Sequence, residues 1–234
     1  MGHPGASVTM LDSVGIAIPA YDAGSTVAEV VRRTFALLPN VLVVDDGSRD
    51  ETRREAAAAG AEVIFNKQNL GKGAALRSAF SVLFGRGFEA VVTVDADGQH
   101  LPEEIPKLIE GWDEGGDLVM GTRDHLYGEM NRVRRASSTL SSRAISFFAG
   151  VELRDCQTGF RLYTRDLIEK TGFPEPRFEA ESAVIVRAAR QGLPILAVPV
   201  RLGFADGLST SHYRPVVDSL RIAAAVARAR FCHS

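Results

Sequence analysis

The chain has little cysteine and no excess of charge. Its two cysteines, Cys156 and Cys232, lie far apart in a sequence of 234 residues and show no metal-ligand spacing. A reduced, cytoplasmic setting is therefore the simplest inference. The formal net charge of −2 offers none of the basic character that nucleic-acid binding requires, so we expect no nucleic-acid partner.

Long apolar runs and the common nucleotide-binding glycine motifs are absent too. No stretch is apolar for long enough to span a bilayer, and residues 1–13 lack the order of a signal peptide, so we expect them to form a flexible leader. No Gly-x-Gly-x-x-Gly follows the first apolar run, which argues against a dinucleotide-binding dehydrogenase. Residues 69–73 (NLGKG) do not form a Walker P-loop.

The chain contains instead a regular alternation of short apolar runs and helical patterns. This rhythm predicts an α/β fold in a single domain, with a central, mostly parallel sheet flanked by helices. The predicted helices include Thr26–Leu37 and Gly73–Phe84. The predicted strands of the first half are Val14–Ile18, Val41–Val44, Ala61–Phe65, Ala90–Val94 and Leu118–Met120.

The second half follows a different order. Its predicted elements are a helix at Val133–Phe148, a polar loop at Asp155–Gly159, a strand at Phe160–Thr164, a helix at Glu179–Gln191 and a strand at Ile195–Val200. We assign residues 14–213 to one domain and residues 214–234 to a C-terminal amphipathic helix.

Four of the predicted strands end in residues that can carry chemistry. Ligands of open parallel sheets bind outside the carboxyl ends of the strands, so these four ends should converge on one crevice. They are Pro19-Ala20-Tyr21-Asp22, Asp45-Asp46-Gly47-Ser48, Asp95-Ala96-Asp97-Gly98-Gln99 and Gly121-Thr122-Arg123.

The third of these ends has two carboxylates separated by one small residue. Two such carboxylates repel each other unless a cation or a shared proton relieves them. Their oxygens suit Mg²⁺ or Mn²⁺, which take further ligands from phosphates and water. Asp95 and Asp97 therefore predict a metal site, although Asp97-Gly98 taken alone could also be an acidic turn.

The other ends fit a nucleotide. Asp45 or Asp46 can accept hydrogen bonds from a base or a ribose, and Tyr21 can pack against a flat ring. Lys72 stands between two glycines at a predicted helix start, where backbone N–H groups and an ammonium favour phosphate. A solvated capping role for Lys72 is the alternative.

In this order, the residues resemble family 2 glycosyltransferases of the GT-A fold, especially the dolichyl- or polyprenyl-phosphate mannosyl- and glucosyltransferases. The resemblance extends from Ile16 to about Ile222. Residues 18–21 (IPAY) look like the family's nucleotide-binding start and residues 43–48 (VVDDGS) like its second motif. Residues 95–97 (DAD) are similar to its DxD motif.

The resemblance implies an inverting transfer of a hexose from a UDP- or GDP-sugar, with Mg²⁺ or Mn²⁺ bridging the diphosphate. It implies Asp97 and Gln99 as metal ligands and Arg123 as a cation at the phosphates, where negative charge develops. The residues assigned to the nucleotide sugar are Pro19, Ala20, Tyr21, Asp45, Asp46, Lys72, Asp95 and Ala96.

Two motifs of the second half extend the resemblance. Residues 155–161 (DCQTGFR) look like the family's loop below the acceptor, and residues 178–181 (FEAE) like its helix-opening acidic pair. For an alcohol acceptor, Asp155, Glu179 or Glu181 could be the general base, whereas an ionised lipid phosphate needs none. Glu179 is more readily explained as an acidic residue that complements the helix dipole.

The chain also departs from the family pattern. Asp22-Ala23 stands where members often carry Asn-Glu, which leaves the preference for a nucleobase open. Residues 204–211 (FADGLSTS) lack the arginine and the lysine of polyprenyl-phosphate enzymes. We therefore assign the acceptor phosphate to Arg134, Arg135, His212 or Arg214.

Two predicted helices combine arginines with apolar residues, which suits a peripheral contact with an anionic membrane at its cytoplasmic face. One is Val133–Phe148 and the other is the C-terminal helix. The apolar stripe of the latter is Leu220, Ala223, Ala224, Ala227 and Phe231, flanked by Arg221, Arg228 and Arg230. Packing of both helices on the sheet is the alternative.

The sequence thus predicts a metal-dependent glycosyltransferase with a polyprenyl phosphate as its acceptor. One alternative keeps the donor but transfers the sugar to a soluble saccharide or small alcohol, with Asp155 or Glu181 as base. Another is a nucleotide-sugar binding module without turnover. A nucleotidyltransferase is disfavoured because the early glycine-rich loop with Arg or Lys is missing.

Overall fold

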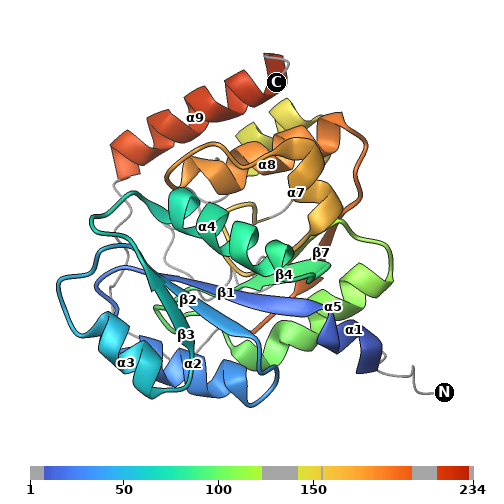
Figure 1. The fold of residues 1–234 in the computed structure, drawn as a ribbon. Coiled ribbons are helices and arrows are strands. Elements are labelled where there is room, and N and C mark those ends of the chain that lie inside the picture. Colours follow the sequence, from blue (N-terminus) through green and yellow to red (C-terminus); the bar gives the residue numbers. More distant parts are fainter. Residues whose placement is uncertain (1–7, 123–141, 154, 202–214, 232–234) are drawn as a thin grey trace.

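A seven-stranded sheet forms the centre of the molecule, in the order β3-β2-β1-β4-β6-β5-β7 (Figure 1). The computed structural model describes residues 8–122, 142–153, 155–201 and 215–231. The strands are β1 (Val14–Ala20), β2 (Val41–Asp45), β3 (Glu62–Phe65), β4 (Ala90–Thr93), β5 (Leu118–Thr122), β6 (Arg161–Thr164) and β7 (Ile195–Pro199). The predicted α/β fold with a mostly parallel sheet in a single domain is confirmed.

Strand β6 is the exception to the parallel order. It runs antiparallel to β4 and β5, with Arg161 opposite both Thr93 and Met120. All other neighbours pair in parallel. Because β6 runs in the opposite direction, the residues that precede it reach the edge at which β1, β2 and β4 end. The loop at residues 155–159 therefore joins the predicted crevice.

Helices cover both faces of the sheet (Figure 1). Buried strand residues alternate between the two faces, so Leu42 and Val44 join one apolar cluster and Val41 and Val43 the other. The helices on one face are α2 (Val27–Phe35), α3 (Thr52–Ala58) and α5 (Ile105–Asp113), with the short turn η1 (Pro102–Glu104) before α5. Those on the other are α4 (Lys72–Gly85), α7 (Arg165–Thr171) and α8 (Glu179–Arg190).

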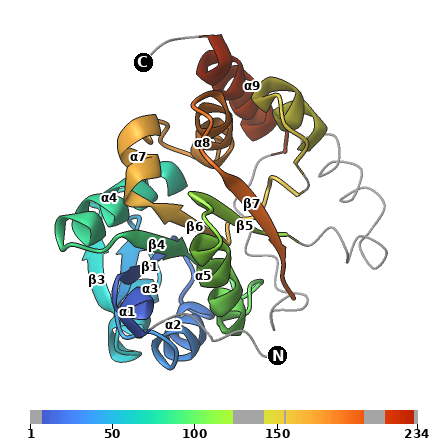
Figure 2. The same cartoon turned by 90° about the vertical axis from the view of Figure 1, so that its right-hand side faces the viewer.

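Helix α9 (Pro215–Phe231) packs on α8 and adds an outer layer (Figure 2). Its buried apolar side chains are Ala225, Val226 and Ala229. The stripe expected to face a membrane lies on the opposite side, where Leu220 and Phe231 are 67% and 73% exposed. In the described part of the chain, no helix has the length and apolar character needed to cross a bilayer.

The structure differs from the prediction at the N-terminus and describes only part of one predicted helix. A short helix, α1 (Val8–Asp12), stands where a flexible leader was predicted, and Leu11 packs half-buried against the core. Burial of the apolar Leu11 side chain against the core stabilises this short helix. Within the predicted helix Val133–Phe148, the described part is helical over residues 142–149.

Candidate functional site

The loops that follow β1 and β2 are joined by hydrogen bonds. The backbone N–H of Asp22 donates to Ser48 Oγ (2.9 Å), and Asp22 Oδ1 accepts from the backbone N–H of Arg49 (2.8 Å). Asp22 has a φ of 48°, a left-handed conformation that Asp and Asn adopt more readily than other side chains. Aspartate at this position therefore fits the backbone of the turn.

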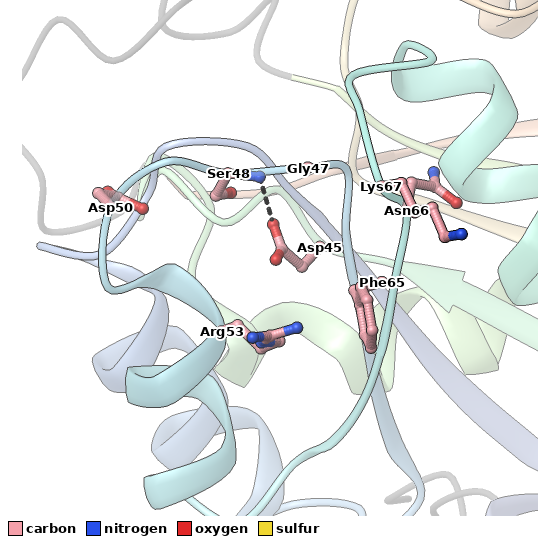
Figure 3. A pocket seen from close by; sticks show the side chains of 8 residues that line it. All are labelled: Asp45, Gly47, Ser48, Asp50, Arg53, Phe65, Asn66 and Lys67. Carbon is pink, nitrogen blue, oxygen red and sulfur yellow. Dashed lines mark hydrogen bonds between the residues drawn. The ribbon is translucent and has the colours of Figure 1, made fainter.

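A polar cavity of about 250 Å³ opens between the ends of β2 and β3 (Figure 3). The Asp45 carboxylate faces this cavity, and its Oδ1 accepts from the backbone N–H of Ser48 (2.9 Å). The Arg53 guanidinium lies 4.5 Å from the centroid of the Phe65 ring. The lining residues are Asp45, Gly47, Ser48, Asp50, Arg53, Phe65, Asn66 and Lys67. Such a cavity offers a ring face and several polar atoms to a small polar ligand.

Unlike Asp45, Asp46 is hydrogen-bonded to the loop at residues 66–71. Its Oδ1 accepts from Asn66 Nδ2 (2.7 Å) and from the backbone N–H of Leu70 (3.0 Å), and its Oδ2 accepts from the backbone N–H of Gly71 (2.7 Å). Three donors directed at one carboxylate fix the loop at residues 66–71. The sequence left open which of the two aspartates meets a nucleotide; only Asp45 lines the cavity.

Lys72, at the start of α4, is the centre of a buried ionic cluster. Its Nζ lies 2.7 Å from Asp95 Oδ1 and 3.0 Å from Glu181 Oε2, and its side chain is 14% exposed. Burial alone would lower the pKa of this ammonium, but the charges of Asp95 and Glu181 outweigh burial and raise the pKa. The solvated capping alternative for Lys72 is therefore wrong, because the ammonium is inside the protein.

Two further residues enclose Asp95. A Cβ added at Gly159 would overlap both the Asp95 carboxylate and the Lys72 ammonium, so only glycine allows this close approach. The ring of His100 stacks on Phe160 with 5.3 Å between centroids, and His100 Nε2 lies 3.8 Å from Asp95 Oδ2. The loop before β6 and the turn after β4 thus meet at Asp95.

The DxD turn follows β4 with its two aspartates half-buried. Asp97 Oδ1 accepts from the backbone N–H of Gln99 (2.9 Å). Ala96 is buried, and its carbonyl accepts from Thr26 Oγ1 (2.6 Å), which ties the turn to α2. Carboxylate and amide oxygens suit Mg²⁺ or Mn²⁺. No group of three or more His, Cys, Asp or Glu side chains could hold a metal within the described ranges, so an ion here would take other ligands from water and substrate.

The loop at residues 155–159 is tied to α8 by a fully buried arginine. Arg161 donates to the carbonyls of Cys156 (2.8 Å), Thr158 (2.8 Å) and Glu181 (2.5 Å). These three acceptors satisfy a charge that would otherwise be costly to bury. Asp155 is buried and has a φ of 48°. Glu179 Oε2 and Glu181 Oε1 are buried and have no hydrogen-bond partner among the described residues.

The structure brings Lys72, Asp95 and Glu181 into direct contact and places Asp45 in the cavity. Five predicted site residues lie outside the described residues, namely Arg123, Arg134, Arg135, His212 and Arg214.

The sequence prediction missed residues that complete the Asp45 cavity and the Lys72 cluster. Asn66 and Lys67 directly follow the predicted strand Ala61–Phe65 and line the cavity, so the position of ligands beyond strand ends is the signal in the sequence that points to them. The sequence contains no signal for the packing of His100 on Phe160 or for the carbonyl contacts of Arg161, since both depend on the antiparallel placement of β6.

Two known proteins are similar in sequence to most of this chain. Glycosyltransferase AglJ of Haloferax volcanii is 33% identical over 213 residues, covering 88% of this chain and 68% of that protein. Polyprenol monophosphomannose synthase of Mycolicibacterium smegmatis is 30% identical over 213 residues, covering 85% and 80% of the two chains.

A likeness in structure supports the same fold. The crystal structure of glucosyl-3-phosphoglycerate synthase from Mycobacterium tuberculosis, in complex with Mn²⁺, UDP-glucose and phosphoglyceric acid, has a TM-score of 0.72 at 20% identity. The likeness covers 100% of this chain and 87% of that one. At this identity it shows the GT-A fold alone.

The family model "Glycosyl transferase family 2" matches residues 15–172, which include the cavity, Lys72, the DxD turn and the loop before β6. Because that range is more than half of the chain and carries most of the site just described, the chain belongs to glycosyl transferase family 2.

Proposed function

We propose that this chain is a metal-dependent, inverting glycosyltransferase that moves a hexose from a UDP- or GDP-sugar to a polyprenyl phosphate. The observation that carries the proposal is the placement of Asp97 and Gln99 on the sheet edge that also holds the Asp45 cavity and the Lys72 cluster. The name of the mannose synthase relative supports a polyprenyl acceptor.

The cavity would take the nucleoside. Asp45 retains acceptor capacity beyond its single bond to Ser48, and Asn66 and Lys67 add donors around it. Pro19, Ala20 and Tyr21, at the end of β1, complete this side of the nucleotide site in our proposal. Asp46 would contribute by holding the loop that carries Asn66.

The diphosphate would lie at the DxD turn. Asp97 and Gln99 would hold Mg²⁺ or Mn²⁺, and the ion would stabilise the negative charge of the leaving nucleoside diphosphate. The crystal structure of the mycobacterial synthase with Mn²⁺ and UDP-glucose supports this choice of metals. Arg123, which follows β5, would add a second positive charge at the phosphates.

Asp95 and Ala96 would contact the sugar. Both Asp95 oxygens have a fixed environment, since Oδ1 meets Lys72 and Oδ2 lies near His100. Lys72 would therefore act on the nucleotide sugar by holding Asp95 in place. A carboxylate fixed in this way can orient a sugar hydroxyl without reorganising during the reaction.

The acceptor side follows from the same chemistry. An ionised polyprenyl phosphate needs no proton removed, and we propose that Arg134, Arg135, His212 or Arg214 binds it. Transfer to a soluble saccharide or alcohol is the second candidate. This second candidate needs a general base, for which Asp155 or Glu181 would serve; Glu181 Oε1 has no hydrogen-bond partner among the described residues, but it is buried and would have to be uncovered by the acceptor.

A transfer assay with both donors tests the main proposal. UDP- and GDP-hexoses are incubated with polyprenyl phosphate and either Mg²⁺ or Mn²⁺, and the lipid-linked sugar is measured. Asp97→Ala should abolish transfer with an unchanged thermal midpoint, while Asp113→Ala, on the exposed end of α5, should behave as wild type. Undiminished transfer by Asp97→Ala would remove the metal assignment.

Thermal shift with nucleotides separates the catalytic proposal from a binding module. A nucleoside diphosphate at 100 times its Kd should stabilise the protein by about 2.7 kcal/mol. Metal-dependent binding without transfer to either class of acceptor would support the module instead.

We further propose a peripheral membrane contact at the cytoplasmic face. The outer face of α9 exposes Leu220 and Phe231, and residues 142–149, which lie beside α9 in Figures 1 and 2, expose Phe147 at 80%. Arg143, Arg221, Arg228 and Arg230 are exposed as well, and arginines beside apolar side chains favour anionic headgroups.

Sedimentation with vesicles tests the membrane contact. The wild type should sediment with anionic vesicles at physiological salt, and Leu220→Asp/Phe231→Asp should remain in the supernatant. Arg32→Gln on α2, an exposed charge on another helix, is the matched control. A wild type that stays in the supernatant would contradict this proposal and leave the transfer proposal intact.

A further inference from the structure

Arg177 is a half-buried arginine whose guanidinium makes no hydrogen bond or ion pair with the described residues. It lies in the segment Gly172–Phe178, between α7 and α8. Other half-buried or buried arginines of the described chain, such as Arg161 and Arg187, use their donors on carbonyls and carboxylates. A guanidinium has five N–H donors, so an arginine that uses none of them retains its full capacity for an anion.

The backbone that carries Arg177 is held firmly on both sides. Arg77 Nη1 donates to the carbonyls of Phe173 (3.1 Å) and Pro174 (2.8 Å). Glu175 forms a two-pronged pair with Arg187, with distances of 2.7 and 2.9 Å. The Pro176 carbonyl accepts from the backbone N–H of Ala74 (2.8 Å). Arg177 therefore projects from a fixed point, which lowers the entropy lost when it binds a ligand.

The stem of Arg177 lies over Gly71, directly before Lys72. A Cβ at Gly71 would come within 2.6 Å of Arg177 Cγ, and the φ of Gly71 is 104°, so glycine provides both the turn and the space. Gly71 is also the residue whose N–H binds Asp46. Arg177 thus stands where the loop of the nucleoside cavity joins the Lys72 cluster.

Arg177 differs from Lys72 in that its positive charge is not paired with a carboxylate of the described residues. The Lys72 ammonium is already bound to Asp95 and Glu181, so its charge is matched inside the protein. A phosphate that arrives beside the cluster would gain from a nearby cation that is not already paired with a carboxylate of the described chain. The planar guanidinium can bind two phosphate oxygens at once.

We propose that Arg177 binds a phosphate group of the substrate pair, and that this contact, rather than packing, is its function. The phosphate belongs to the donor diphosphate or to the acceptor, and both offer the same anionic oxygens. The inference rests on the proposed function for the identity of the substrates, whereas the anion site itself rests on the geometry of Arg177 and Gly71.

Two measurements on Arg177→Ala and Arg177→Lys distinguish the sources. Calorimetric titration with UDP or GDP and Mg²⁺ gives the Kd of the donor product, and steady-state kinetics give KM for the polyprenyl phosphate. In Arg177→Ala, the loss of a charge-assisted contact should raise either the Kd for the nucleotide or the KM for the polyprenyl phosphate about tenfold to a hundredfold. Arg177→Lys, which retains the charge but not the fork, should recover part of the loss.

The outcomes separate cleanly. A raised Kd assigns Arg177 to the donor, and a raised KM with an unchanged Kd assigns it to the acceptor. The inference is overturned if Kd and KM are unchanged in both variants. It is also overturned if binding is lost only together with a lowered thermal midpoint and Arg177→Lys does not restore it. Arg32→Ala is the matched control. Wild-type protein that binds no nucleotide would instead contradict the proposed function.

Discussion

The Asp45 cavity and the Lys72 cluster lie on the same edge of the sheet but are built in opposite ways. The cavity is open and polar, and Asp45 within it uses one hydrogen bond to its own loop. In the cluster, Lys72 meets two carboxylates inside the protein, and Glu181 is only 9% exposed at its side chain. The first region keeps its polar atoms for a ligand, whereas the second uses them on itself.

The difference shows how one site can combine adaptability with fixed geometry. Asp45 is itself buried, but it lines the cavity and its carboxylate makes a single hydrogen bond to its own loop, so it can still accept hydrogen bonds from a ligand. A buried charge must be paired at all times, because an unpaired one costs several kcal/mol. The cluster is therefore the rigid part of the site, and in our proposal the cavity is the part that binds the nucleoside.

The largest test of this comparison removes the cation of the cluster. Lys72→Met would remove the ammonium that both the half-buried Asp95 and the buried Glu181 contact, and we expect the free energy of unfolding to fall by about 3–5 kcal/mol. Urea denaturation at pH 7 measures it. Lys72→Met/Glu181→Gln should regain part of the loss, since one of the opposed charges is removed. A loss below about 1 kcal/mol would show that the cluster is solvated and not rigid.

A second test compares two adjacent aspartates. Asp46→Asn should lower the free energy of unfolding by about 2 kcal/mol, because the amide cannot accept from all three donors that meet this carboxylate. Asp45→Asn should leave stability unchanged and weaken nucleoside diphosphate binding about tenfold. Denaturation and calorimetric titration of both variants decide it. Equal effects of the two substitutions would contradict the division of roles.

The same two regions differ in how far sequence could predict them. The apolar runs predicted all seven strands to within two residues, because most of these strands are buried on both faces and read as continuous apolar segments. The cavity residues Asp45 and Ser48 belong to one short motif after β2. Local patterns of this kind follow directly from the chain.

The cluster could not be predicted in this way. Lys72, Asp95, Gly159 and Glu181 come from four separate parts of the chain, and their contact depends on the antiparallel insertion of β6 between β4 and β5. No periodicity distinguishes an antiparallel strand from a parallel one when both are buried. Similarly, the sequence showed the apolar stripe of α9, but a second, alanine-rich face of that helix packs on α8.

The smallest expected effect concerns a carboxylate outside both regions. Glu104, before α5, pairs with Lys107 Nζ (2.5 Å) and Arg201 Nε (2.6 Å). Burial alone would raise the pKa of Glu104, but hydrogen bonds from Lys107 and Arg201 outweigh burial and lower its pKa. A carboxyl whose pKa is lower in the folded state adds stability above its unfolded pKa and loses it as the pH falls.

Glu104→Gln should therefore be less stable than wild type at pH 7, and the difference should fade below about pH 4, near the unfolded pKa of glutamate. We expect about 1 kcal/mol, because the side chains of Lys107 and Arg201 are 45% and 70% exposed, so that water screens both pairs. Urea denaturation at pH 7, 5 and 3 measures the trend. A difference that stays constant with pH would mean that the buried Glu104 side chain contributes through packing and not through its charge. The contrast in charge pairing with the Lys72 cluster would then be lost.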